Sequence, residues 1–272
     1  MTPVAAMRAM QDATPSLRDI VGPWLRHNRR PEAAEHEALV VLFDSSQWTG
    51  FRSEASRVLP SQERERSLRF RQEQHRDAYV MAHAVWRLVL GDVLGMAPED
   101  VALASTAHGQ PCLPGTGYAT SLSHSGNHVA IAVARAECIG IDVEQAPPRT
   151  GMRDLLKVVC TPEEADTIGA FAAHEQDAAL LALWTRKEAL LKAFGVGLLA
   201  TPSTIRADAG MPIAPPALAA DMPACIVHSL TLPKGWVGAL AAPGHISELR
   251  VHWLPMHTTA VHTDGSEHWP VL

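Results

Sequence analysis

The chain lacks the features that mark several large classes of protein. Its four cysteines are widely spread and contain no C-x-x-C pair, so neither a zinc site nor a disulfide framework is indicated. No apolar run approaches the ~20 residues of a membrane-spanning helix. Charges also interrupt the segment from Met1 to Ile20, so we expect a soluble, cytoplasmic protein without a membrane span.

An excess of positive charge is also missing. The formal net charge is −6 at pH 7, which disfavours nucleic acid as a partner and favours small ligands or proteins. Neither a phosphate-loop lysine motif nor a dinucleotide glycine fingerprint is present, so a P-loop kinase or a Rossmann enzyme is unsupported. The 272 residues, 47% of them hydrophobic, are enough for two modest domains or one large one.

The segment from Trp184 to Leu198 carries the strongest pattern in the chain. If it is a helix, positions four apart share a face, so Trp184, Glu188 and Lys192 form one stripe with Lys187 beside it. Apolar side chains on the remaining surface can anchor the helix in a core: Leu183, Leu190, Leu191 and Phe194. A mixed-charge stripe is then left to face another element.

A second polar group lies on a predicted strand from Cys138 to Glu144. The period of two places Asp142 and Glu144 on one face of this strand. Two acids on one face of an apolar strand either lie at a solvated edge or share a cation or donors. If Glu188 meets them, the three carboxylates form a hard oxygen site of the kind that holds Mg²⁺, with lysines nearby to bind phosphate.

Two other polar segments allow two interpretations each. A predicted helix that begins at Pro60 carries several arginines between positions 64 and 76, interleaved with glutamates. These arginines form either a solvated helix face or a phosphate-binding group. The segment from Ser121 to His128 is predicted to be a polar loop that leads into an apolar strand, and its hydroxyls and imidazoles are either surface groups or ligand contacts.

The overall pattern predicts an α+β protein with two similar, pseudo-symmetric subdomains and an active site in the cleft between them. Long helices near Trp86 and Trp184 are each followed by a glycine exit and by strands, which suggests an internal repeat. The expected divisions are a loosely packed extension (1–37), two subdomains (38–138 and 139–254) and a tail (255–272). Helices are expected at 77–94 and 176–194, and strands at 38–43, 101–103, 129–133, 138–144, 204–206, 224–230, 236–241 and 249–254.

At three motifs the chain resembles a known family, the 4′-phosphopantetheinyl transferases of the longer, surfactin-synthetase-activating (Sfp-like) type. The motifs are Gly140-Ile141-Asp142-Val143-Glu144, the block Trp184-x-x-Lys187-Glu188-x-x-x-Lys192-x-x-Gly195, and Ser123-His124-Ser125 upstream. Their order and their gaps together are highly specific, and the resemblance extends over about residues 60 to 245.

This resemblance implies transfer of 4′-phosphopantetheine from coenzyme A to a serine of an apo acyl or peptidyl carrier protein, with release of adenosine 3′,5′-bisphosphate. It implies a monomer of secondary-metabolite biosynthesis in which Asp142, Glu144 and Glu188 bind Mg²⁺. Lys192 would contact the diphosphate, and Glu188 or a metal-bound water would accept the serine proton. Further coenzyme A contacts are expected from Arg66, Arg69, Arg76, Gln110, Ser123, His124 and Lys187.

Two positions depart from the family pattern. Gln110 stands in a turn where the family often has Lys or Arg, and His75 precedes Arg76 where an acid is common. Both departures would alter the affinity for coenzyme A without removing a metal ligand.

Two other functions remain open, a catalytically silent coenzyme A or carrier-binding protein and a Mg²⁺-dependent phosphohydrolase. The intact carboxylates argue against the first, and the Trp-x-x-Lys-Glu block is unexplained by the second. Whether the carrier serves fatty-acid, polyketide or nonribosomal-peptide synthesis is not specified by these residues.

Overall fold

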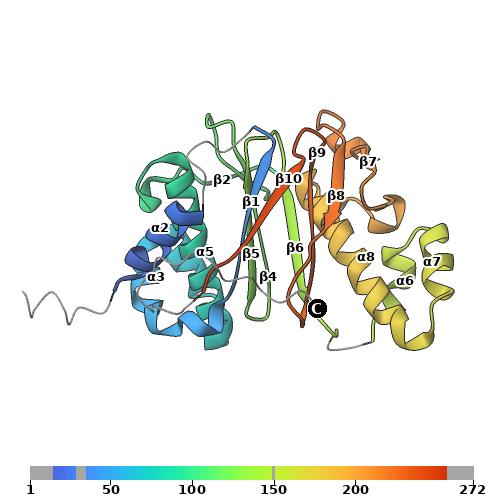
Figure 1. Cartoon of the computed structure of the whole chain (residues 1–272), viewed down its shortest axis with the longest axis horizontal. Coiled ribbons are helices and arrows are strands. Elements are labelled where there is room, and N and C mark those ends of the chain that lie inside the picture. Colours follow the sequence, from blue (N-terminus) through green and yellow to red (C-terminus); the bar gives the residue numbers. More distant parts are fainter. Residues whose placement is uncertain (1–14, 29–34, 149–150, 256–272) are drawn as a thin grey trace, which may run out of the picture.

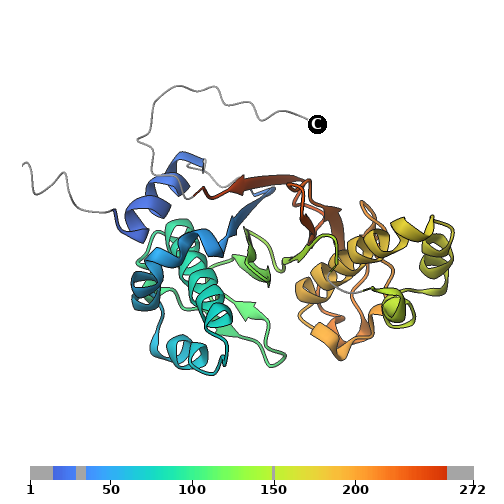
Figure 2. The same ribbon diagram turned by 90° about the horizontal axis from the view of Figure 1, so that it is seen from below.

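The computed structural model describes residues 15–28, 35–148 and 151–255, which form four layers in the order helices, sheet, sheet, helices (Figures 1 and 2). The first sheet has the strand order β10-β1-β5-β4 and the second has the order β6-β9-β8-β7. Two further strands, β2 and β3, pair as a short ribbon. The bounds are β1 (Glu37–Asp44), β2 (Ala104–Ser105), β3 (Pro111–Cys112), β4 (Ala119–Ser125), β5 (His128–Ala134), β6 (Gly140–Gln145), β7 (Pro212–Ile213), β8 (Cys225–Ser229), β9 (Trp236–Pro243) and β10 (Glu248–Trp253).

Each sheet has its own helices on its outer side, as Figure 2 shows from below. The first sheet carries α2 (Leu17–Asn28), α3 (Arg52–Val58), α4 (Ser61–Ser67) and α5 (Glu73–Leu94), and the second carries α6 (Leu156–Val159), α7 (Pro162–Gly169) and α8 (Ala173–Ala193). Short 3₁₀ turns lie at Ser45–Phe51, Pro98–Asp100, Arg153–Leu155, Gly197–Leu199, Pro202–Thr204 and Ala217–Ala219. Among the helices in the described ranges, none combines the length and the apolar character that a membrane crossing requires.

The core is arranged by the alternation of side chains along the strands. In β1, Leu39 and Val41 pack with the first group of helices, whereas Val40 and Leu42 belong to the core between the two sheets. The strand β6 contributes Ile141 to this inter-sheet core. Because successive side chains point to opposite faces of a strand, Asp142 is turned away from the inter-sheet core and toward α8.

The two halves repeat the same strand order, which supports the predicted internal repeat. The order β1-β5-β4 in the first half matches β6-β9-β8 in the second, and one long helix follows the first strand in each case. The last strand breaks this symmetry, because β10 pairs in parallel with β1 of the first sheet. The predicted second subdomain, 139–254, is therefore wrong in including β10. This strand covers an edge of the apolar strand β1 that would otherwise be open.

Other predictions need correction at the level of single elements. The segment 1–37 is not a loose extension throughout, because α2 buries Leu17, Val21 and Leu25 fully in the first core. Residues 1–14 and 29–34 of that segment, and the tail from 256 onward, lie outside the described residues. Within the described ranges no strand forms at 101–103 or 204–206. The other predicted strands, and both long helices, are confirmed with shifts at their ends.

Candidate active site

The close approach of α8 to β6 depends on a glycine. A Cβ atom at Gly140 would lie 2.0 Å from the carbonyl oxygen of Ala189 and 2.5 Å from the amide nitrogen of Ala193, both in the last turns of α8. Only a residue without a side chain leaves room for the helix backbone at this distance. The glycine of the Gly140–Glu144 motif thus fixes how near the polar stripe of α8 comes to the acids of β6.

Lys192, Asp142 and Ser123 form the centre of the resulting polar cluster. The Lys192 Nζ atom lies 2.7 Å from Asp142 Oδ1, 2.9 Å from Ser123 Oγ and 3.1 Å from the carbonyl oxygen of Ile141. Ser123 Oγ also donates to Asp142 Oδ1 at 2.8 Å. One side chain each from α8, β6 and β4 therefore meets where the two halves join.

Two more carboxylates lie within electrostatic range of this centre, Glu144 and Glu188. Burial, together with the charge of Asp142, raises the pKa values of Glu188 and Glu144, while Lys192 opposes the shift in both. Buried oxygens of two of the acids, Asp142 Oδ2 and Glu188 Oε1, find no hydrogen-bond partner among the described residues. Such atoms are costly unless a cation or a donor approaches them, so the site suits a positively charged group.

The predicted Mg²⁺ site fits the residues in chemistry, although its side chains do not form a finished set of ligands. Within the described ranges, no three His, Cys, Asp or Glu side chains are grouped closely enough to hold a metal ion. The ammonium of Lys192 instead pairs with Asp142. The two unpartnered oxygens and the raised pKa values of Glu144 and Glu188 are the features that a divalent cation would satisfy.

The segment that was predicted to be a loop is the strand β4, and Ser123, a predicted coenzyme A contact, lies on it between Ser121 and Ser125. Ser121 accepts a hydrogen bond from the amide of Ile141, Ser123 lies next to Asp142, and Ser125 donates to Glu144. Their spacing of two residues is the signal of a strand with one polar face. The serines join the edge of the first sheet to β6 and orient both acids.

The predicted coenzyme A contacts on the first half fall into two groups, His124 and the arginines. His124 is exposed on β4. Partial desolvation of its ring and the charges of His83, Lys192 and His75 lower its pKa, so the imidazole lies within electrostatic range of both α5 and α8. Arg66 and Arg69 line a small hollow beside Phe70, and Arg76 donates to the carbonyl oxygen of Phe70 at 3.1 Å. The arginines are thus grouped around Phe70, and their contact with coenzyme A stays a prediction.

Lys187 does not join the cluster, and its predicted contact with coenzyme A is not supported. Its side chain is 1% exposed and its Nζ atom donates to Glu164 and to the carbonyl oxygens of Val159 and Pro202. The residue next to Glu188 on the helix thus points into the second core, where it fixes α7 on α8. Helical periodicity alone could not separate these two directions, because adjacent positions differ by about 100°.

Gln110 is also held by protein groups. Its Nε2 atom donates to the carbonyl oxygens of Lys192 at 2.8 Å and of Ala193 at 3.2 Å. The turn that carries it lines a cleft of about 230 Å³ between the halves, with Lys192 and Ser121 on its other walls.

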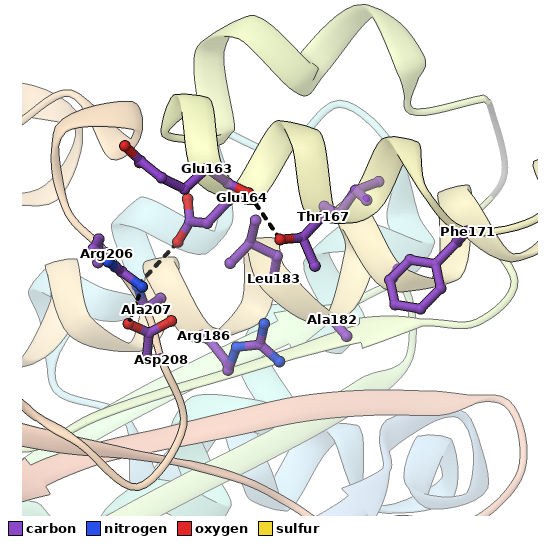
Figure 3. A pocket seen from close by; sticks show the side chains of 12 residues that line it. Glu163, Glu164, Thr167, Phe171, Ala182, Leu183, Arg186, Arg206, Ala207 and Asp208 are labelled. Carbon is purple, nitrogen blue, oxygen red and sulfur yellow. Dashed lines mark hydrogen bonds and ion pairs between the residues drawn. The ribbon is translucent and has the colours of Figure 1, made fainter.

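Two other cavities border the second half. One of about 350 Å³ is lined by Ser125 and Glu144 on one side and by apolar side chains on the other, among them Trp184, Leu181 and Leu155. The second, of about 290 Å³, lies between α7 and α8 and contains Arg186, which makes none of the dashed contacts drawn in Figure 3. This second cavity shares no lining residue with the acidic cluster.

The groups at this junction define a class of site. The carboxylates and the lysine at the junction of the two α+β halves are the kinds of group that bind a cation and a phosphate ester. The lysine and the basic residues can bind phosphate oxygens, and a carboxylate with a raised pKa is a stronger base than an ordinary carboxylate.

Comparisons with known proteins identify the family. Residues 138–214 match the model of the 4'-phosphopantetheinyl transferase superfamily, and residues 46–136 match the model of the N-terminal part of 4'-phosphopantetheinyl transferase. The chain belongs to the 4'-phosphopantetheinyl transferase superfamily and is of the Sfp-like type.

Individual relatives agree with this assignment. The chain is 32% identical over 145 residues to the 4'-phosphopantetheinyl transferase HetI of Nostoc sp., covering 52% of this chain and 61% of the relative. It is 27% identical over 138 residues to the 4'-phosphopantetheinyl transferase Sfp of Bacillus subtilis, covering 50% and 60%. It is 34% identical over 110 residues to the 4'-phosphopantetheinyl transferase AcpT of Salmonella typhi, covering 40% and 56%. The chain thus spans less than two thirds of the length of these relatives.

Proposed function

We propose that this chain transfers the 4′-phosphopantetheine group from coenzyme A to a serine of an apo acyl or peptidyl carrier protein and releases adenosine 3′,5′-bisphosphate. The observation that carries the proposal is the contact of Lys192 with Asp142 at the junction of the halves, with Glu144 and Glu188 within electrostatic range of both. Family membership supplies the class of reaction. The same relationship supports a monomer that acts in the cytoplasm, in secondary-metabolite biosynthesis.

Each residue of the cluster has one role in the proposed transfer. The carrier serine oxygen attacks the phosphorus next to the pantetheine, a new P–O bond forms there, and the P–O bond to the adenosine bisphosphate breaks. Glu188 Oε1, which lacks a partner among the described residues, accepts the serine proton. Lys192 stabilises the negative charge that develops on the leaving phosphate, and Ser123 keeps Lys192 and Asp142 in position.

Asp142, Glu144 and Glu188 are the side chains that would hold Mg²⁺. A bound Mg²⁺ supplies Lewis-acid polarisation and neutralises charge on the diphosphate. The two unpartnered carboxylate oxygens and the raised pKa values of Glu144 and Glu188 support this assignment. Removal of divalent ions with a chelator should therefore stop transfer, and added Mg²⁺ should restore it.

An extended ligand with several phosphates suits the arginines and the imidazole on the first half. His124 lies within electrostatic range of Lys192 on one side and of His75 and His83 on the other. Arg66, Arg69 and Arg76 are grouped beyond them around Phe70. We assign the diphosphate to Lys192, a further phosphate to His124, and the adenosine end to the arginines.

The carrier would approach from the opposite side, where Glu144 lines the cavity of about 350 Å³. Leu155 lines this cavity and is 41% exposed, and the neighbouring Val158 is 53% exposed. Carriers are recognised by apolar contacts together with a few charges, and this surface offers the apolar part.

The mass of the carrier protein after incubation distinguishes the candidate functions. The protein is incubated with coenzyme A, Mg²⁺ and a set of purified apo carriers from fatty-acid, polyketide and nonribosomal-peptide systems, and each carrier is analysed by mass spectrometry. Addition of one phosphopantetheine group per carrier supports transfer and also identifies the carrier class. Hydrolysis of coenzyme A without a carrier adduct would favour a phosphohydrolase, and binding without either product would favour a silent coenzyme A or carrier-binding protein.

A further inference from the structure

The end of α8 is held by a side chain from the other half of the molecule. Gln110 lies in the turn between β2 and β3, and its amide group donates to the carbonyl oxygens of Lys192 and Ala193 at 2.8 and 3.2 Å. The carbonyls in the last turn of a helix have no partner within the helix, so donors from outside stabilise the helix end. The Lys192 carbonyl accepts from the backbone amide of Gly195 at 3.2 Å, and Gln110 adds a second donor to it and a donor to the Ala193 carbonyl. The contact between Gln110 and Lys192 joins residues 82 positions apart in the chain.

Gly195 completes the contact from the side of α8. It follows the helix with φ +67°, a conformation that glycine adopts without strain. A Cβ atom at this position would lie 2.1 Å from Gln110 Oε1. The Gln110 side chain therefore fills the space that the glycine leaves open, and its amide is directed at the helix carbonyls.

The contact with Gln110 also affects Lys192, the lysine of the polar cluster. The ammonium of Lys192 is held by Asp142, Ser123 and the carbonyl oxygen of Ile141, while its own backbone carbonyl is held by Gln110. A lysine side chain is a flexible four-carbon stem, so the position of its charge depends on where the backbone is fixed. Both ends of Lys192 are thus fixed by groups from outside α8.

We propose that Gln110 is a positioning residue that fixes the C-terminal turn of α8, and with it Lys192, against the first half. Both carbonyl contacts use the amide nitrogen of Gln110, so the side chain is committed to α8 and does not bind a coenzyme A phosphate. This replaces the expectation, drawn from the family pattern, that position 110 contacts the cofactor. The catalytic part of the inference rests on the proposed function, and the structural part does not.

Two variants and one control test the proposal. Gln110→Met keeps the length of the side chain and removes the donor, and Gln110→Asn keeps the amide but shortens its reach by one methylene group. Ala107→Ser, an exposed position in the same turn, is the control. Hydrogen–deuterium exchange of residues 191–197 is measured together with kcat and KM for coenzyme A.

Both Gln110 variants should exchange faster in 191–197 and should lose about tenfold or more in kcat, because a small misplacement of a catalytic group is costly. KM for coenzyme A should stay within about twofold, as expected when ground-state binding is unchanged. The control should match the wild type in every measurement.

Unchanged exchange in the two variants would overturn the proposal. A tenfold higher KM with unchanged kcat would also overturn it and would make Gln110 a coenzyme A ligand. If the wild type modifies no carrier, the proposed function fails, but the exchange measurement still decides whether Gln110 holds the helix end.

Discussion

Replacement of Gly140 by alanine would test how strictly the spacing between β6 and α8 controls the site. The new Cβ would lie 2.0 Å from the Ala189 carbonyl oxygen and 2.5 Å from the Ala193 amide nitrogen. Both are backbone atoms, so no side chain can rotate away to relieve the overlap. The helix and the strand must separate instead.

The size of the separation follows from the contact distance. Ordinary van der Waals contacts begin at 3.4 Å, so the helix must retreat by roughly 1.4 Å, the difference between 3.4 and 2.0 Å. Overpacking of this kind typically costs about 1–3 kcal/mol. A shift of this size also takes Lys192 and Glu188 away from Asp142, and a misplacement of ~1 Å can lower a rate by ~10²-fold.

The free energy of unfolding is measured by circular dichroism, and the rate of transfer by the gain in mass of an apo carrier. Gly169→Ala serves as the matched control, because a Cβ at that position meets no described atom within 4 Å other than its chain neighbours and the nearby backbone of its own helix. We expect Gly140→Ala to be less stable and about a hundredfold slower, and Gly169→Ala to resemble the wild type. A Gly140→Ala protein with wild-type stability and rate would refute the role given to this spacing.

Three further perturbations test other parts of the structure. Glu188→Gln should abolish transfer and leave the melting temperature unchanged or higher, since it removes a buried charge; turnover at saturating Mg²⁺ would contradict this. Lys187→Met should lower the free energy of unfolding by about 3 kcal/mol, because its buried carboxylate partner is left unpaired, and a stable variant in urea unfolding would disprove the structural role. Burial raises the pKa of Glu63, but His83 and Arg87 outweigh this effect and lower it to about 2 from the usual 4.5. Ionised Glu63 therefore stabilises the fold above pH 4.5. The difference in free energy of unfolding between wild type and Glu63→Gln should narrow as the pH falls toward 2. A difference that does not change with pH would contradict the link between the ionisation of Glu63 and stability.

The parts of the site that lie on regular elements could be predicted from the sequence. The period of two placed Asp142 on one face of β6, and the period of 3.6 placed Glu188 and Lys192 on one stripe of α8. The ion pair between Lys192 and Asp142 shows that these two faces meet. Short-range periodicity was sufficient here because each face is defined within one element.

The remaining parts depend on contacts between distant segments, which periodicity does not report. Lys187 is next to Glu188 in sequence, yet it faces Glu164 of α7, and only the packing of α7 reveals this. The serines of β4 suggest a turn, so the sequence predicts a loop there. In the structure these serines contact the strand β6. The pairing of β10 with β1 joins segments more than 200 residues apart, as the register Glu37 with Glu248 shows.

The pairing of β10 with β1 affects how the protein folds during synthesis. During synthesis β1 emerges early, but the strand that covers its free edge emerges only with residues 248–253. Until then the nascent first half exposes an apolar strand edge, which is a site for unwanted association. Separate expression of residues 35–138 would leave this edge uncovered permanently. The two halves therefore mature as one unit, although each has its own helices and its own sheet.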